Sequence, residues 1–117
     1  MRIDFNRVFI GFAGALAAVA IAERPARADD PATYTLTLKG DAFTPDALKV
    51  AAGKAFVLKL INGEASGVEI EAKDLKIEKI VPAGGEVVAH VKALAPGKYL
   101  LVNEYKEETV KTFVVAE

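Results

Sequence analysis

Few residues in this sequence have side chains that could perform chemistry. The 117 residues include no Cys and a single His, His90. The absence of Cys excludes disulfides, thiolate nucleophiles and thiolate metal sites, and one His excludes sites built from several imidazoles. The sequence contains no Ser with a base partner, no glycine-rich phosphate loop and no HExxH pair. Carboxylates are therefore the side chains left to coordinate a metal ion, and we expect no enzyme activity.

The overall charge gives no support to nucleic-acid binding. The chain has 15 Lys and Arg against 16 Asp and Glu, which gives a formal net charge of −1. Without a basic excess it lacks the electrostatic attraction on which binding to phosphate backbones depends. At this length we expect one domain, too small for the cofactor cradle of a large enzyme.

Residues 1–28 have the order of a secretory signal peptide. Two arginines precede an apolar stretch at 8–22, and Ala26 and Ala28 place small residues three positions and one position before a cleavage site. The apolar stretch is shorter than the about 20 residues that a transmembrane helix needs. We therefore expect cleavage after residue 28, a periplasmic location and no membrane insertion. An uncleaved N-terminal anchor is the alternative.

Residues 29–117 alternate between apolar and polar side chains with a period of two. Tyr34, Leu36 and Leu38, for example, share one face of their segment and leave threonines on the other, which is the pattern of a half-buried strand. Glycines and prolines separate such segments, where turns require them. Strands are expected at 33–38, 47–50, 54–61, 68–71, 77–81, 86–92, 98–104 and 109–115, with one helical turn at 72–76. Seven or eight short strands at this spacing predict an all-β, Greek-key β-sandwich.

Three segments, in this order, resemble the cupredoxin family. They read FTPDALKVAAGKAFVLKLIN at 43–62, VEIEAKDLKIEKIVPAGG at 68–85 and LAPGKYLL at 94–101. The sequence is most similar to the EfeO-type cupredoxin-like domains of bacterial iron-uptake systems. The resemblance extends over nearly all of residues 29–117 and implies a cupredoxin-like domain there.

The resemblance also allows a test for copper. Family members with a blue (type 1) copper site carry His, Cys and His ligands at the positions that match Val68, Asn103 and Lys106, and a weak axial Met near Val110 or Lys111. All four ligands are replaced in this chain. A type 1 site needs a thiolate and two imidazoles, so we do not expect type 1 copper.

The resemblance instead points to acidic residues around the same loops. In a sandwich these loops would converge at one end, and three or four carboxylates there would suit a hard or borderline cation such as Fe³⁺, Mn²⁺ or Ca²⁺. The candidate metal ligands are Glu69, Glu71, Asp74, Glu78 and Glu104.

Interleaved lysines support a second interpretation of these acids. In the segment EIEAKDLKIEK the charges alternate in sign, as they do on a solvated edge that discourages pairing with other chains. Lys106 would also repel a cation bound nearby. The acidic residues are therefore either a metal site or an exposed charged edge.

The expected function follows from the resemblance and from these acids. We expect a periplasmic cupredoxin-like accessory protein that binds a metal ion, iron by the resemblance, in an uptake pathway. The alternative is a metal-free module that docks on a membrane permease or a periplasmic partner, because the scaffold is kept while every copper ligand has changed. His90 is interpreted as an exposed strand residue. Asn62 matches a cupredoxin Asn that ties loops together, and Asn103 could act similarly.

Overall fold

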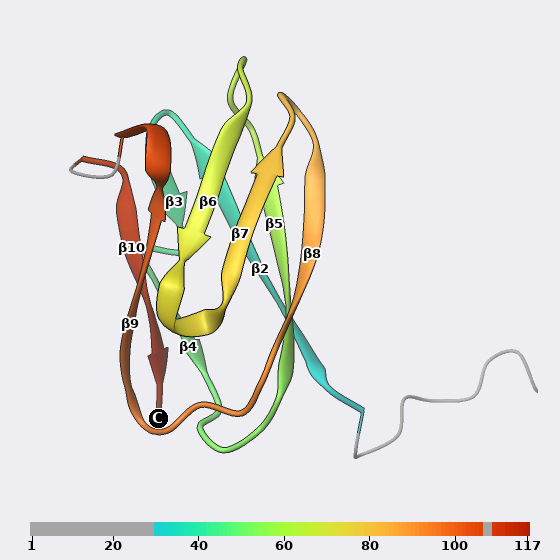
Figure 1. Ribbon diagram of the computed structural model, residues 1–117, viewed down its shortest axis with the longest axis vertical. Coiled ribbons are helices and arrows are strands. Elements are labelled where there is room, and N and C mark those ends of the chain that lie inside the picture. The colour runs from blue at the N-terminus through green and yellow to red at the C-terminus, as the bar shows by residue number, and fades with distance from the viewer. Residues whose placement is uncertain (1–29, 107–108) are drawn as a thin grey trace, which may run out of the picture. The chain divides into compact units, whose positions relative to one another are not determined.

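The structure is a computed structural model that describes residues 30–106 and 109–117. The predicted signal peptide lies outside these residues. A compact unit spans Pro31–Glu117. Its described residues form a five-stranded and a four-stranded sheet that pack face to face (Figure 1). The predicted all-β sandwich is therefore confirmed.

The five-stranded sheet carries most of the residues that the sequence marks as candidates for function. β10 pairs with β4 in parallel, and all other neighbours in this sheet are antiparallel. The strand order is β4 (Ala47–Val50), β10 (Lys111–Ala116), β9 (Gly97–Asn103), β6 (Val68–Ala72) and β7 (Ile77–Val81).

The four-stranded sheet closes the other side of the core. Its central pair, β2 and β5, is parallel, whereas β3 and β8 add to it in antiparallel fashion. The order is β3 (Ala42–Thr44), β2 (Ala32–Lys39), β5 (Phe56–Asn62) and β8 (Glu86–Val91).

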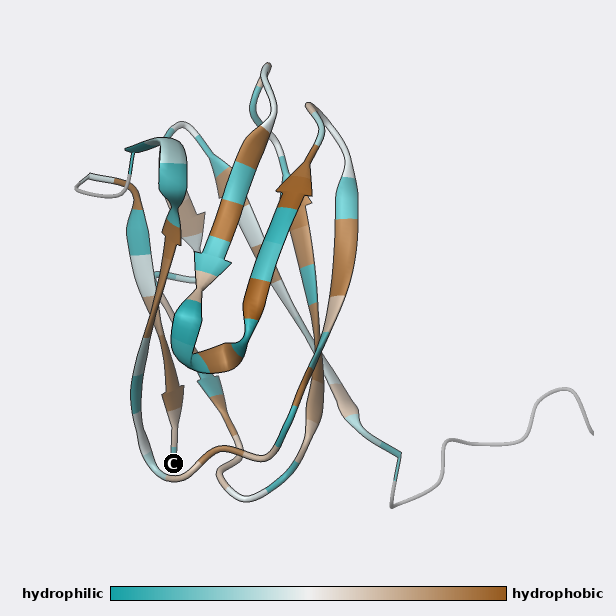
Figure 2. Cartoon of the chain, in the orientation of Figure 1, coloured by the Kyte–Doolittle hydropathy of each residue, from teal (hydrophilic) through white to brown (hydrophobic). Residues whose placement is uncertain are grey.

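The core consists of the alternate side chains of both sheets. Leu36, Leu58 and Leu101 are at most 1 % exposed, and hydrophobic and hydrophilic residues alternate along the strands in Figure 2. Burial of an aliphatic side chain of this size contributes about 1.5–3 kcal/mol. Because the chain has no disulfide, this interdigitated aliphatic layer is the main source of its stability.

The structure differs from the predicted elements by one added strand and at several strand ends, among them those of 54–61, which runs from Phe56 to Asn62. The short strand β3 was not predicted, because three residues are too few to show alternation. The strand expected at 98–104 ends at Asn103, and Glu104–Lys106 form a 3₁₀ turn, η3. The strand expected at 109–115 begins at Lys111. The helical turn expected at 72–76 is confirmed as a 3₁₀ turn, η2 (Lys73–Leu75).

A two-residue turn connects β2 to β3. Lys39 pairs with Ala42, and the turn residues Gly40 and Asp41 both have positive φ, 63° and 58°. This is the geometry of a type I′ hairpin turn, which glycine adopts without strain and which Asp tolerates better than most residues. Among the described residues, no helix has the length and apolarity needed to cross a membrane.

Candidate metal centre

Three of the predicted ligands meet at one point of the five-stranded sheet. Glu69 lies on β6, Glu78 on β7 and Glu104 in η3, and one carboxylate oxygen of each lies within 4.8 Å of the others. Glu69 and Glu104 are half-buried, and Glu78 is exposed. Three oxygen donors at this spacing could coordinate one cation between them.

The strand pairing explains how the three carboxylates meet. In the β6–β7 hairpin Glu71 pairs with Glu78, so Glu69 is the diagonal neighbour of Glu78 on the same face. On the other side of β6, Ile70 pairs with Asn103 of β9. Glu104 follows Asn103 directly, so η3 begins beside Glu69.

The cluster raises the pKa of the Glu69 carboxyl above its ordinary value of 4.5. Partial burial is the largest cause, followed by the negative charge of Glu104, hydrogen bonds with Glu78 and Glu104, and the negative charge of Glu78. Each of these disfavours the ionised form of Glu69. A bound cation would remove this repulsion, because it supplies the positive charge that the cluster lacks.

The other two predicted ligands lie outside this group. Glu71 and Asp74 line a shallow pocket on the same sheet, together with Lys73, Leu100 and Val102. The structure thus brings together Glu69, Glu78 and Glu104 of the predicted set, but not Glu71 and Asp74.

The positions that match the copper ligands also come together, at the end of the sandwich. Val68, Asn103 and Lys106 line one pocket with residues of the β2–β3 turn and of the segment 64–67. An aliphatic group, an amide and an ammonium cannot supply the thiolate and imidazoles of a type 1 site. The residues present therefore do not fit copper of this kind.

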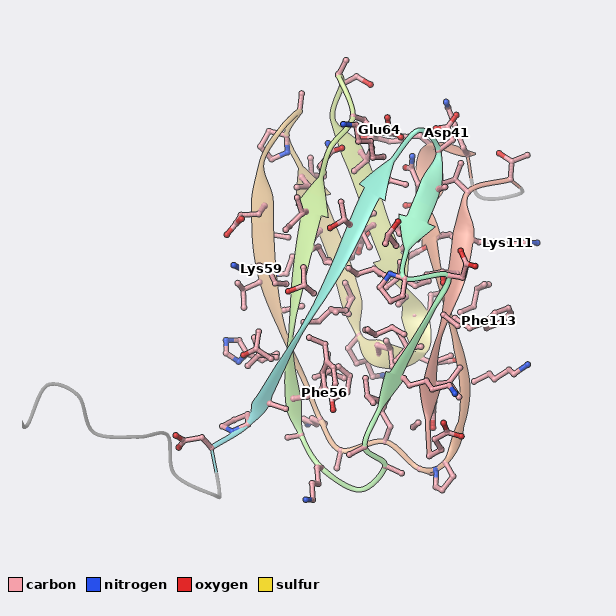
Figure 3. All side chains as sticks on the ribbon, turned by 180° about the vertical axis from the view of Figure 1, so that it is seen from behind. Asp41, Phe56, Lys59, Glu64, Lys111 and Phe113 are labelled. Carbon is pink, nitrogen blue, oxygen red and sulfur yellow. The ribbon has the colours of Figure 1, made fainter. Side chains whose placement is uncertain are left out.

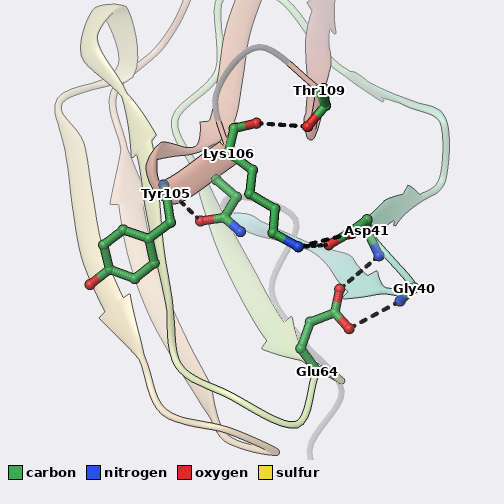
Figure 4. A network of polar contacts seen from close by, with 7 residues as sticks. Gly40, Asp41, Glu64, Tyr105, Lys106 and Thr109 are labelled. Carbon is green, nitrogen blue, oxygen red and sulfur yellow. Dashed lines mark hydrogen bonds and ion pairs between the residues drawn. The ribbon is translucent and has the colours of Figure 1, made fainter.

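A polar network connects three loops around this pocket (Figure 4). The Lys106 ammonium donates to both carboxylate oxygens of Asp41, at 3.1 and 3.0 Å. The backbone N–H groups of Gly40 and Asp41 donate to the Glu64 carboxylate at 3.2 and 2.7 Å. Lys106, whose charge argued against a metal site, thus has an anionic partner in the hairpin turn. The sequence did not predict this network, because its residues are far apart in the chain.

Two buried asparagines hold the loops at the same end, as predicted. The amide of Asn62, 1 % exposed, donates to the carbonyls of Ser66, Val81 and Pro82 at 2.9–3.1 Å, and its oxygen accepts the Glu64 N–H at 2.8 Å. The Asn103 oxygen accepts the Tyr105 N–H at 3.2 Å, across the first turn of η3.

The interpretation of His90 as an exposed strand residue is likewise confirmed. His90 is exposed on the edge strand β8 of the four-stranded sheet.

Comparison with known proteins identifies the family. A family model described as a cupredoxin-like domain matches residues 12–116, a match that begins within the predicted signal peptide. The chain therefore belongs to the family of cupredoxin-like domains. Among curated proteins it is similar to the uncharacterized protein RP394 of Rickettsia prowazekii, with 28 % identity over 80 residues, 68 % of this chain. The match spans 64 % of that relative's length.

Solved structures with low sequence identity share the fold. One is the metal-binding domain, with Cu(I), of the Cu(I)-exporting ATPase CopA of Streptococcus pneumoniae (TM-score 0.64, 13 % identity, 73 % of this chain and 84 % of that one). Another is auracyanin of Roseiflexus castenholzii (TM-score 0.60, 16 % identity, 73 % and 96 %). A third is auracyanin A of Chloroflexus aurantiacus, a blue copper protein (TM-score 0.56, 15 % identity, 75 % and 100 %). At this identity the likeness shows the fold alone.

Proposed function

We propose that the protein is a periplasmic accessory protein that binds a hard metal ion through Glu69, Glu78 and Glu104. The observation that carries the proposal is the meeting of three carboxylate oxygens, from β6, β7 and η3, within 4.8 Å of one another. No enzymatic step is part of the proposal, and type 1 copper is excluded from it by the donor types at Val68, Asn103 and Lys106.

The chemistry of the cluster favours a hard cation. All three donors are anionic oxygens, which prefer Fe³⁺, Mn²⁺ or Ca²⁺ to Cu⁺. Burial and, after it, the neighbouring charges and hydrogen bonds of Glu104 and Glu78 raise the pKa of Glu69, so the metal-free cluster disfavours its ionised form. A bound cation stabilises all three carboxylates in their ionised form.

We propose iron as the cation, carried as cargo in an uptake pathway. The support is the resemblance of the sequence to the EfeO-type domains of iron-uptake systems, together with the oxygen-only donor set. In cells grown at low iron, deletion of the protein should lower the uptake of radioactive Fe, and the Glu78→Ala/Glu104→Ala variant should fail to restore it.

Calorimetric titration of the purified protein tests the metal site. We expect the native protein to bind Mn²⁺, Ca²⁺ and Fe³⁺, the last supplied as a weak chelate. The Glu78→Ala/Glu104→Ala variant should bind none of them. Glu71→Ala/Asp74→Ala is the matched control, because it removes the same charge from β6 and the neighbouring turn η2, outside the cluster. Native protein that binds no cation more tightly than about 1 mM, the weak limit of protein Ca²⁺ sites, would contradict the proposal.

The polar network at the copper positions favours a second candidate, a metal-free docking module. There Lys106, at the position of a copper ligand, forms an ion pair with Asp41 at 3.0 Å instead of offering a ligand atom to a metal. Such a module would hold its permease or periplasmic partner equally well with and without EDTA. Retention that is lost in EDTA and restored by added metal would favour the metal-binding function instead.

A further inference from the structure

We propose that the pocket at the end of the sandwich binds an uncharged peptide group through the side-chain amide of Asn103. This pocket, which the β2–β3 turn, the segment 64–68 and the residues at the start of η3 enclose, has a volume of about 310 Å³. Pockets that bind small molecules measure about 300–1,000 Å³, so a ligand of one or a few peptide groups matches its size.

The Asn103 side chain carries a hydrogen-bond donor without an acceptor. Asn103 lines the pocket and is 3 % exposed, and its amide oxygen accepts the Tyr105 N–H at 3.2 Å. This bond fixes the orientation of the amide, because a backbone N–H can bond to the oxygen but not to the NH₂ group. In the part of the chain that the structure describes, no atom accepts a hydrogen bond from that NH₂ group. A buried donor without a partner is costly, and a ligand that offers an oxygen atom removes the cost.

The charged side chains of the pocket, in contrast, already have partners. Asp41 accepts from Lys106, and Glu64 accepts from the N–H groups of the β2–β3 turn (Figure 4). Asp41 and Glu64 lie close together at this end of the sandwich in Figure 3. With one lysine against two acids the lining has a net charge of −1, so a ligand with a carboxylate of its own is repelled.

A peptide group has the polarity that this lining requires. Its carbonyl oxygen accepts from the Asn103 NH₂ group, and its N–H can donate to a carboxylate oxygen of Asp41 or Glu64, each of which has unused lone pairs. It carries no net charge and therefore avoids the repulsion that an anion meets. A single water could accept the same bond, but its share of volume, about 30 Å³, leaves most of the pocket unfilled.

Nuclear magnetic resonance of the ¹⁵N-labelled protein in EDTA tests the proposal, because it observes the Asn103 NH₂ group directly. The chain has no Gln and, besides Asn62 and Asn103, Asn only at position 6, so few side-chain amide signals are present. The probe is N-acetylglycinamide, an uncharged molecule with two amide groups. It should shift the Asn103 pair saturably, with a Kd of about 10 mM or below. The Asn62 pair, which already donates to three carbonyls, should not move.

A charged probe and two variants test the specificity. N-acetylglycine has nearly the same size but carries a carboxylate, and it should bind at least about tenfold more weakly. Asn103→Asp keeps an oxygen for the Tyr105 N–H but replaces the donor, so backbone signals of the segment 64–68 should no longer respond to the probe. Ala65→Trp, at an exposed residue of the pocket wall, should block the site and leave Asn103 in place. Ala93→Trp, at an exposed residue between β8 and β9, is the matched control and should bind like the native protein.

Circular dichroism should show that the variants fold, and Ala65→Trp with its control decides the matter if Asn103→Asp does not. An Asn103 pair that shows no saturable shift up to about 100 mM N-acetylglycinamide would overturn the proposal. Equal binding of the two probes, or undiminished binding by Ala65→Trp, would do the same. Of the described residues that line the pocket, none belongs to the metal cluster. Failure here therefore leaves the proposed metal site standing.

Discussion

Asn62 is the side chain on which the loops at the end of the sandwich, around the pocket of Val68, Asn103 and Lys106, depend most. It is buried, and its two amide hydrogens are shared among three carbonyls from two segments, 66 and 81–82. Removing the amide takes this donor from the buried Val81 carbonyl and the part-buried Ser66 carbonyl, whereas the Pro82 carbonyl still accepts the Gly85 N–H. A buried polar group left without a partner costs about 1–3 kcal/mol.

We predict that Asn62→Ala lowers the free energy of unfolding by about 3 kcal/mol, measured by urea denaturation. Asn103→Ala is the comparison, since the Asn103 side chain makes one hydrogen bond with a backbone N–H, that of Tyr105. We expect about 1 kcal/mol for that variant. Equal costs for the two variants would contradict the structural role given to Asn62.

Glu69 should make the stability of the metal-free protein depend on pH. Its pKa is raised in the folded state above the ordinary value of 4.5, so the folded chain binds this proton more tightly than the unfolded chain. The stabilisation from the protonated carboxyl is full below that value. It is lost as the pH rises through the raised folded-state pKa.

We predict that Glu69→Gln, which stays neutral, becomes increasingly stable relative to the native protein as the pH rises above 4.5. Melting temperatures in EDTA across this pH range are the measurement. Glu71→Gln, on the same strand but outside the cluster, should follow the native curve. A constant difference between Glu69→Gln and the native protein would show that the cluster does not act on Glu69.

At the scale of elements, the β2–β3 turn supports the network opposite η3. Gly40 and Asp41 present consecutive N–H groups to Glu64, and Asp41 also accepts from Lys106 (Figures 3 and 4). This arrangement requires positive φ at both turn residues.

We predict that Gly40→Ala costs about 1–2 kcal/mol of unfolding free energy, because its φ of 63° is unfavourable for a residue with a Cβ. The new Cβ would meet nothing within 4 Å, so the cost is one of backbone conformation. Gly67→Ala is the control: its Cβ would lie 3.7 Å from the Val81 carbonyl oxygen, an ordinary contact, and should cost less than about 0.5 kcal/mol. Urea denaturation of both variants measures the difference.

Elements with clear alternation could be predicted from the sequence, and those without it could not. β2 shows Leu36 and Leu38 on one face, and the structure buries both. β3 is too short to alternate, and η3 is specified by the Asn103 side chain, which accepts the Tyr105 N–H and ends the strand. A side chain that accepts a hydrogen bond from the backbone N–H two residues later leaves no periodic signal in the sequence.

At the scale of the whole molecule, pairing between distant strands decides which acids meet. Glu69 and Glu78 lie on strands joined by the short connection 73–76, so hairpin geometry could have predicted their approach. Glu104 comes close to Glu69 and Glu78 only because β9 pairs with β6 in one register. The sequence pattern contains no information on that register, and for this reason it could not separate Glu104 from Glu71 and Asp74 as ligands.

Anomalous X-ray scattering from crystals soaked in Mn²⁺ is the most direct test of the proposed metal centre. Mn²⁺ is a cation that oxygen donors accept, and its anomalous signal marks its position. We predict a peak within coordinating distance of Glu69, Glu78 and Glu104, and none in the pocket of Val68, Asn103 and Lys106. Soaked crystals with no peak at the carboxylates, or with Mn²⁺ in that pocket instead, would contradict the account.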